Sequence, residues 1–221
     1  SGCAPHAVTF HDNYSINAAP GWLWDFGDGT TSSDPNPTHV YTDAGLYTVM
    51  LIRTALDGCV DTFKVENWIE VANPQAQFTT NSVIDCSPVL ASFNNQSTGA
   101  TTFTWHFGDG STSALNNPTH IYSTPGTYYP SLVANHPMGC SDSVISLSPV
   151  VVQGPNVAFT VSDTLGCDRL MVMFDNQTSG ATTYEWNFGN GQTSFDENPQ
   201  FEFDVPGTYD ITLIAEDTAG C

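Results

Sequence analysis

The chain has 221 residues, of which 3 are Lys or Arg and 23 are Asp or Glu, giving a formal net charge of −20. Nucleic acids and anionic membranes are bound through many Lys and Arg contacts to phosphate, so this composition excludes both as partners. The 13 Phe, 8 Tyr and 5 Trp are too many for a disordered acidic tail. No apolar run reaches the roughly 18 residues of a membrane span, so we expect no membrane insertion of this segment.

One six-residue phrase, Trp-x-Phe-Gly-Asp/Asn-Gly, occurs three times, beginning at Trp24, Trp105 and Trp186. The tryptophans lie 81 residues apart, from 24 to 105 and from 105 to 186, and Asn-Pro, Gly-x-Tyr and Gly-Cys phrases recur at the same step. This period is too long for a solenoid turn and suits a small independent domain. The sequence therefore predicts three consecutive domains, called here module 1 (1–73), module 2 (74–154) and module 3 (155–221).

Within one period every segment has the character of a strand. In module 2 these segments are residues 76–79, 89–93, 103–107, 119–122, 128–134 and 143–152. They are short, rich in β-branched and aromatic residues, and bounded by Gly, Pro, Asn or Asp. No segment has a convincing helical period. Six or seven short strands in about 80 residues predict an all-β, immunoglobulin-like sandwich.

The repeated phrase also predicts the core. Side chains alternate between the two faces of a strand, so Trp105 and Phe107 project to one face and Thr104 and His106 to the other. The predicted core residues are the same two aromatics in each module and a tyrosine that follows a turn: Trp24, Trp105, Trp186, Phe26, Phe107, Phe188, Tyr47, Tyr128 and Tyr209. We expect the tyrosines to brace the sandwich as a tyrosine corner.

The six-residue phrases resemble those of the PKD (polycystic kidney disease) domain, as do Asn-Pro-Thr-His-x-Tyr from Asn36 and Asn117 and Pro-Gly-Thr-Tyr from Pro125. The resemblance covers essentially the whole chain. It implies tandem immunoglobulin-like sandwiches, as in extracellular adhesins, surface-layer proteins and accessory modules of secreted hydrolases. The Gly-Cys pairs look most like multi-copy PKD arrays of Bacteroidetes surface proteins. Module 3 departs from the pattern, with Gln200 and its three successors replacing Thr-His-x-Tyr.

Six cysteines form an early set (Cys3, Cys86, Cys167) and a late set (Cys59, Cys140, Cys221). An even number at regular spacing predicts disulfides and therefore an oxidising, extracellular compartment. Two pairings stay open at this point. Pairing within each module is the simpler one, although the sandwich topology places early and late cysteines at opposite ends. Pairing between stacked modules would join Cys3 to Cys140 and Cys86 to Cys221.

The sequence is out of phase with its repeat. Module 1 lacks the first strand that residues 74–80 and 155–161 supply, and module 3 lacks the last strand that residues 61–71 and 143–152 supply. Soluble proteins avoid exposed sheet edges, so we expect further copies of the module on both sides in a longer chain. The short linkers predict a semi-rigid rod of roughly 35–45 Å per module.

No arrangement of residues predicts catalysis or a cofactor. Asp25 and Asp28 lie three residues apart, but module 3 has Asn187 and Asn190 instead, which favours a turn over acid–base chemistry. No Ser-His-Asp, Cys-His or phosphate-binding arrangement occurs. No Cys-x-x-Cys pair or closed ligand loop predicts a metal site. Some PKD-like modules bind calcium, so calcium stays open with no ligands assigned.

Two smaller features have structural or modification interpretations. His39 and His120 each lie on a predicted strand without a neighbouring catalytic or metal-binding partner in the sequence. We align them with Glu202 of module 3, and this replacement favours a structural role for the two histidines. Three tripeptides that begin with Asp resemble the O-glycan acceptor of Bacteroidetes proteins, with acceptor hydroxyls on Ser143, Thr164 and Thr218.

The leading hypothesis is a non-enzymatic structural or adhesive stalk, or a filament segment, of a secreted bacterial cell-surface repeat protein. Repetition, short linkers and cysteine pairs suit this mechanical role. An alternative is a binding accessory region of a secreted enzyme that degrades glycans or proteins, which needs a catalytic domain elsewhere in the parent chain. Lateral self-association into a fibre through open strand edges is a third. The protein or glycan ligand is not identified by the sequence.

Overall fold

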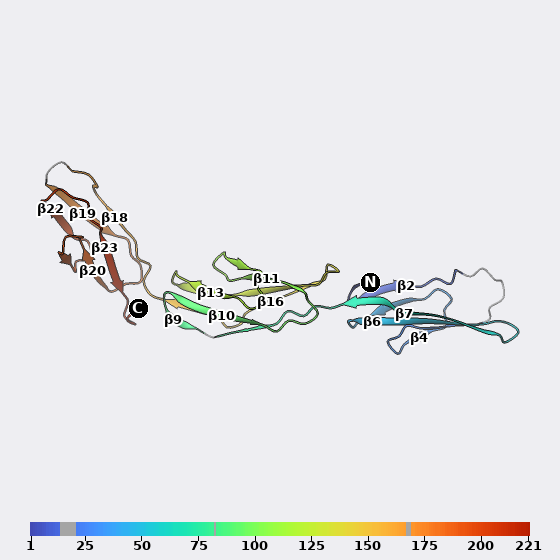
Figure 1. Cartoon of the computed structure of the whole chain (residues 1–221). Helices are drawn as coiled ribbons and strands as arrows, with labels where there is room; N and C mark the ends of the chain where they lie inside the picture. The colour runs from blue at the N-terminus through green and yellow to red at the C-terminus, as the bar shows by residue number, and fades with distance from the viewer. Residues whose placement is uncertain (14–20, 82, 167–168) are drawn as a thin grey trace.

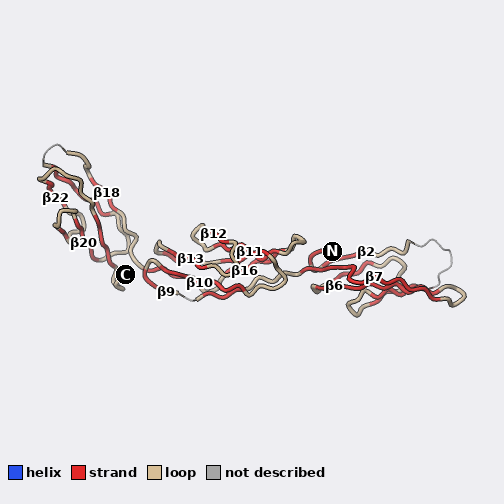
Figure 2. The backbone as a smooth tube through the Cα atoms, in the orientation of Figure 1, coloured by secondary structure: helices blue, strands red, loops and turns tan. Residues whose placement is uncertain are grey.

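The computed structural model describes residues 1–13, 21–81, 83–166 and 169–221. Figure 1 shows three strand-rich bodies that follow one another along the chain, with the N-terminus beside the junction of the first two. The regular structure of the described residues is all strand (Figure 2), and they contain no helix long and apolar enough to cross a membrane. The chain is therefore all-β and built of tandem modules.

Module 1 is a sandwich of a five-stranded sheet and a strand pair. Its strands are β1 (Gly2–Cys3), β2 (His6–Thr9), β3 (Gly21–Asp25), β4 (Thr31–Ser32), β5 (Thr38–Tyr41), β6 (Gly45–Thr54) and β7 (Val60–Ala72). The sheet has the order β1-β7-β6-β3-β4, and β2 pairs with β5. Strand β1 is parallel to β7, while the other pairs are antiparallel.

Module 2 divides the same plan among more strands. These are β8 (Phe78–Thr80), β9 (Ile84–Cys86), β10 (Val89–Asn95), β11 (Thr102–His106), β12 (Thr112–Ser113), β13 (Thr119–Tyr122), β14 (Gly126–Tyr128), β15 (Ser131–Asn135), β16 (Ser141–Ile145) and β17 (Val150–Gln153). One layer has the order β13-β10-β8. The facing layer consists of β12-β11-β15-β16 and β14-β17-β9.

Module 3 contains β18 (Phe159–Val161), β19 (Leu170–Asn176), β20 (Thr183–Asn187), β21 (Thr193–Ser194), β22 (Gln200–Phe203) and β23 (Thr212–Glu216). Its sheets are β18-β19-β22 and β21-β20-β23. Within the described ranges, module 3 has no counterpart of β16 and β17, and module 1 has no counterpart of β8. The longer array that we expect around the chain, and the module boundaries, stay predictions.

Each module has its own aromatic core. The two layers meet where a phenylalanine of one contacts the repeated tryptophan of the other, with ring centroids 5.3 Å apart for Phe10–Trp24, 5.4 Å for Phe93–Trp105 and 5.3 Å for Phe174–Trp186. All six aromatics of the repeated phrase are buried, each at most 3 % exposed. Aromatic pairs of this kind add to the stability that burial of their apolar surface provides.

The three turn tyrosines do not belong fully to these cores, so their assignment as core residues is wrong in part. Tyr47, Tyr128 and Tyr209 pack against the cores but remain half-buried. Each hydroxyl donates to the carbonyl four residues earlier, over 2.8, 2.7 and 2.7 Å respectively. Because that carbonyl lies in a surface turn, the ring stays at the edge and braces the corner. The buried tyrosines are Tyr41 and Tyr122 instead.

A backbone irregularity recurs in the sheet that contains β6 and β7 in module 1 and in the layer that contains β14 and β15 in module 2. In module 1 the pairing of β6 with β7 shifts register between Tyr47 and Val49. In module 2 the corresponding residues are Tyr128 and Pro130, and there the strand is interrupted between β14 and β15. Proline has no N–H to donate to a sheet ladder, so it is found at such interruptions. The same bend is thus made by a bulge in one module and by proline in the next.

Candidate functional site

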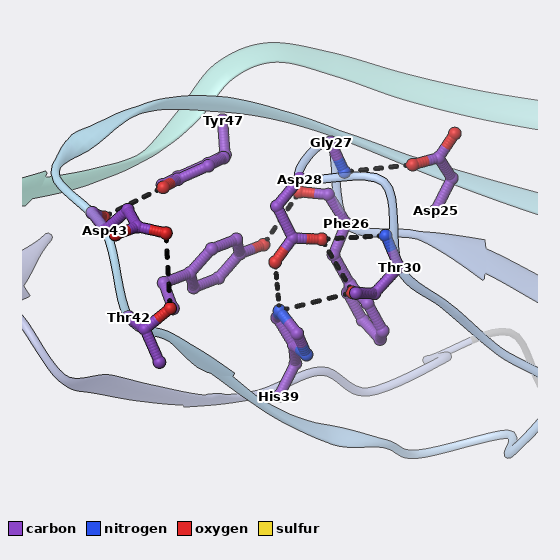
Figure 3. A network of polar contacts seen from close by, with 10 residues as sticks. Asp25, Phe26, Gly27, Asp28, Thr30, His39, Thr42, Asp43 and Tyr47 are labelled. Carbon is purple, nitrogen blue, oxygen red and sulfur yellow. Dashed lines mark hydrogen bonds and ion pairs between the residues drawn. The ribbon is translucent and has the colours of Figure 1, made fainter.

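The repeated phrase ends one strand and forms the tight turn into the next. In module 1, Asp25 Oδ1 accepts a hydrogen bond from the N–H of Gly27 over 2.9 Å. Asp28 Oδ1 accepts from the N–H of Thr30 over 3.0 Å and from its hydroxyl over 2.6 Å (Figure 3). Short Asp side chains commonly close turns in this way on the backbone two residues ahead.

The first glycine of the turn is required by both its conformation and its surroundings. Its φ angle is 82° at Gly27, 91° at Gly108 and 75° at Gly189, in the left-handed region that favours glycine. A Cβ at Gly189 would lie 2.8 Å from the carbonyl oxygen of Asp210, at the position of the bend described above. The turn therefore lies directly against the irregular part of the neighbouring strand.

A histidine from the opposite layer reaches this turn. His39, on β5, has Nε2 at 2.7 Å from Asp28 Oδ2, and Figure 3 shows both side chains pointing toward one another. The His39 ring stacks on Phe26 at 4.2 Å with an interplanar angle of 1°. Because β5 and the turn belong to different sheets, this contact joins the two layers of the sandwich at one end.

A buried tyrosine supplies a second link between the layers. The hydroxyl of Tyr41, also on β5, donates to the carbonyl oxygen of Phe26 over 3.0 Å. Burial raises the pKa of the Tyr41 hydroxyl above its ordinary value, and the negative charge of Asp28 adds to the effect. The phenol therefore stays neutral and keeps its donor proton at any physiological pH.

Module 2 repeats the arrangement. His120 Nε2 lies 2.6 Å from Asp109 Oδ2, and the His120 ring stacks on Phe107 at 4.3 Å. The hydroxyl of Tyr122 donates to Phe107 O over 2.8 Å. Burial alone would raise the pKa of Asp109, but hydrogen bonds from Ser111 and His120 outweigh it and hold the pKa at about 2. The pKa of Asp28 is lowered in the same way, by Thr30 and His39.

Module 3 replaces both partners of the pair together, and this corrects the alignment used above. The residue at the histidine position is Phe201 and not Glu202, because Phe201 pairs with Val172 as His120 pairs with Ala91. Phe201 stacks on its neighbour Phe188 at 4.2 Å. Since Asn190 stands where modules 1 and 2 have aspartate, acid and histidine are exchanged as a unit. This joint exchange is the sequence signal that could have revealed the pair.

The geometry of the Asp–His pair does not suit nucleophilic catalysis. In a Ser-His-Asp triad the hydroxyl and the carboxylate bind different nitrogens of the imidazole. Here Ser111 Oγ, at 3.1 Å, and Asp109 Oδ2 both approach Nε2 of His120. The Ser111 hydroxyl also contacts Asp109 Oδ1 directly. The pair therefore acts as a polar clamp that fixes the turn to the opposite sheet.

Replacing Asp109 with Asn is expected to destabilise module 2 by about 1 kcal/mol at pH 7, since the charge-assisted hydrogen bonds are weakened. The folded-state pKa of about 2 lies below the ordinary value, so this contribution is present above about pH 4 and is lost as the pH falls toward 2. Urea denaturation of both proteins across this range would measure it. Exposed Asp85→Asn is the control, and an effect that does not shrink toward pH 2 would contradict the clamp.

A comparison with protein-family models decides the family. The model described as "PKD domain" matches this chain three times, over residues 3–71, 68–152 and 147–221. The chain belongs to the PKD domain family. The three matches together cover nearly all of it, so the resemblance seen in the repeated phrases holds for every module.

Relatives of these PKD modules include much longer proteins. The collagenase ColA of Bacillus cereus is 44 % identical over 54 residues, which is 23 % of this chain and 6 % of that protein. The pre-pro-metalloprotease PrtV of Vibrio cholerae is 35 % identical over 81 residues, 35 % of this chain and 9 % of that protein. The chain thus spans less than a tenth of either relative, and the part shared with PrtV has the length of one 81-residue repeat.

Among solved structures, one described as "Structural basis for the promiscuous specificity of the carbohydrate-binding modules from the beta-sandwich super family" is similar over 65 % of this chain and 84 % of its own. The identity is 17 % and the TM-score 0.32. A similarity this low carries no information about a ligand of the present PKD modules.

The cysteines join consecutive PKD modules. Cys3 is bonded to Cys140 with their Cα atoms 5.5 Å apart, and Cys86 to Cys221 with their Cα atoms 5.2 Å apart. The structure therefore has the between-module pairing and not the within-module one. Disulfides persist in oxidising compartments, which is consistent with an extracellular location. Cys59 is free and exposed, while Cys167 lies outside the described residues.

The remaining assignments from the sequence concern metals and glycans. Within the described ranges, no group of three or more His, Cys, Asp or Glu side chains is arranged to hold a metal ion. The three hydroxyl residues of the glycan-like tripeptides, Ser143, Thr164 and Thr218, are all exposed. Their glycosylation stays a prediction that this exposure permits.

Proposed function

We propose that this chain is a stalk segment of a secreted, cell-surface repeat protein. In this stalk, PKD modules joined by disulfides hold a distant functional part away from the cell. The observation that carries this proposal is the pair of disulfides between consecutive modules. A linker of a few residues would by itself allow neighbouring domains to reorient. A second covalent connection at the same junction removes most of that freedom.

The position of each disulfide favours this mechanical role. The last strand of module 2, β17, runs parallel to β9 with Gln153 opposite Cys86, so the early cysteine lies where the chain leaves the module. The late cysteine lies at the opposite end, where Asp142 accepts a hydrogen bond from the N–H of Ala76 over 2.7 Å. A bond between early and late cysteines therefore spans the junction beside the linker.

The clamps inside the modules support the same proposal. Each Asp–His pair joins the two layers of a sandwich, and each buried tyrosine adds a second link. Such cross-layer contacts resist sliding of the sheets, which suits a segment that carries load. They contribute no reactive group, which supports the non-catalytic role proposed here.

Small-angle X-ray scattering of the oxidised chain tests the stalk. We expect an elongated particle of roughly 35–45 Å per module with a narrow size distribution. The Cys86→Ser, Cys221→Ser double variant is expected to give a broader one, because module 3 is then held by its linker alone. Identical scattering profiles for the two proteins would contradict the proposal that the disulfides restrict the junction between modules. The control is Cys59→Ser, which removes a thiol that is free and exposed.

A second candidate is a binding accessory region of a secreted enzyme, favoured by the similarity to a collagenase and a metalloprotease. It predicts that the chain is retained on insoluble collagen or on polysaccharide beads. A stalk predicts passage through both. Retention that survives the disulfide variant would favour the accessory role.

A further inference from the structure

The turn of module 3 contains the only Asn-Gly pair of the sequence, Asn190-Gly191, where modules 1 and 2 have Asp28-Gly29 and Asp109-Gly110. Asn190 is exposed. A side-chain amide of asparagine can be attacked by the main-chain nitrogen of the residue that follows it. Glycine permits this attack best, because it has no side chain to crowd the nitrogen. The geometry of the turn decides whether the pair can react in the folded module.

The turn holds and polarises the side-chain amide of Asn190. Its Oδ1 accepts a hydrogen bond from the N–H of Gln192 over 3.1 Å. Negative charge develops on this oxygen when a nucleophile attacks the amide carbon, and an N–H already directed at it stabilises that charge. The same hydrogen bond folds the amide back over the peptide unit between the two residues, as in other turns of this kind. The amide carbon is therefore activated beside the nitrogen of Gly191.

The main-chain nitrogen of Gly191 is available as the nucleophile. Among the hydrogen bonds of the described residues, none has the N–H of Gly191 as its donor. Gly191 is exposed, and a Cβ placed on it would meet no atom within 4 Å. Water and hydroxide can therefore reach this N–H and remove its proton.

The same turn contains an asparagine that lacks such a nucleophile. Asn187 Oδ1 accepts from the N–H of Gly189 over 2.9 Å, so its amide is held in the same way. The residue between them is Phe188, whose side chain is 1 % exposed and whose N–H donates to Gln192 O over 3.1 Å. That nitrogen is already bonded and is attached to a buried side chain. The two asparagines therefore differ in the nucleophile and not in the amide.

We propose that Asn190 is a site of spontaneous modification, at which the turn of folded module 3 converts its own asparagine into aspartate and isoaspartate. The nitrogen of Gly191 gives its proton to hydroxide and forms a bond to Cγ of Asn190. The bond from Cγ to the amide nitrogen breaks, and ammonia leaves with a proton taken from water. Water then opens the cyclic imide at either of its carbonyls. Opening at one carbonyl gives aspartate, and opening at the other gives isoaspartate, whose main chain is longer by a methylene group.

The aspartates at the same position of modules 1 and 2 resist this reaction. An aspartate forms the imide when its carboxyl is protonated, because the group that leaves is then water. Burial raises the pKa of Asp109, but hydrogen bonds from Ser111 and His120 outweigh it and hold the pKa at about 2. The pKa of Asp28 is lowered in the same way. Both carboxylates stay ionised at neutral pH, so the reaction is specific to module 3.

The products change module 3 and do not restore the Asp–His pair of its neighbours. Phe201 occupies the histidine position, so the new carboxylate has no imidazole to bind. The longer main chain of isoaspartate lies one residue from Gly189, where a Cβ would already be 2.8 Å from the carbonyl oxygen of Asp210. We expect the calorimetric transition of module 3 to fall to lower temperature as the products accumulate.

Peptide mapping by mass spectrometry tests the proposal on the oxidised full chain. The chain is incubated, folded and at mildly alkaline pH, in water enriched in heavy oxygen. We expect the peptide that contains Asn190 to lose its amide, to take up heavy oxygen from the water and to separate into two products of equal mass. Asn187 in the same peptide should keep its amide. The proposal is overturned if Asn190 keeps its amide in the folded chain, or if Asn187 loses its amide as fast.

Two glycine variants form a matched pair. Gly191→Ala is expected to slow the loss of the Asn190 amide at least ~10-fold, because the added methyl group crowds the attacking nitrogen and raises the barrier. Gly110→Ala makes the same change in module 2, at a φ of 93° against 88° for Gly191, and should leave the reaction unchanged. Calorimetry of both variants measures the strain of alanine at this φ. An unchanged rate in Gly191→Ala would also overturn the proposal. If that variant does not fold, the comparison of Asn190 with Asn187 in the unaltered chain decides.

Discussion

Replacing Trp105 with Ala is expected to unfold module 2. The side chain is fully buried, with its ring 5.0 Å from Phe78 and 5.4 Å from Phe93, and its Nε1–H donates to Leu115 O over 2.9 Å. Removing a buried indole leaves a cavity and costs about 3–5 kcal/mol. Small domains have total stabilities of only about 5–15 kcal/mol, so the loss removes most of the stability of one module. Calorimetry of the whole chain should show one cooperative transition lost or strongly lowered.

The matched control is Trp68→Ala in module 1. Trp68 is 47 % exposed and its ring contacts Phe10 at 5.8 Å. We expect a loss of less than about 1 kcal/mol, as for exposed substitutions that remove a single contact. A Trp105→Ala chain that melts with unchanged transitions would show that this indole does not organise the core, and the sandwich assignment would then be wrong.

Removing the disulfide between modules 2 and 3 is expected to have the second large effect. Cys86 and Cys221 are separated by 135 residues in the sequence, so their bond closes a long loop in the unfolded chain. On the chain-entropy account, loops of this order stabilise the folded state by roughly 4–5 kcal/mol. Denaturation of the Cys86→Ser, Cys221→Ser chain under oxidising conditions should therefore begin at a markedly lower denaturant concentration.

The control for this prediction is a variant of the free cysteine, and the result that would contradict it is a different cysteine pairing. Cys59→Ser removes a free and exposed thiol, and we expect its effect on the denaturation midpoint to be within about 0.5 kcal/mol. A digest without reducing agent should contain peptides that join Cys3 to Cys140 and Cys86 to Cys221. A peptide joining Cys86 to Cys140 would show pairing within the module and would contradict the disulfide between modules 2 and 3.

Much of the candidate site could be predicted from repetition alone. The alternation of Trp105 and Phe107 with polar residues identified a buried face, because a strand exposes alternate side chains to opposite sides. The alignment of His120 with Glu202 was wrong, although the 81-residue step from His120 leads to Phe201. The pairing register of β19 with β22 confirms that Phe201 occupies the histidine position. A shift of one residue in a strand exchanges its two faces, so the wrong alignment concealed the joint exchange of acid and histidine.

The all-β fold, the three modules and the aromatic core could be predicted from the sequence, because these depend on local periodicity, turn residues and repetition. The cysteine pairing could not, since it depends on which ends of neighbouring modules adjoin in space. The tertiary structure also showed that Asp109 binds His120. These features depend on distances between residues far apart in the chain, and no local pattern contains such distances.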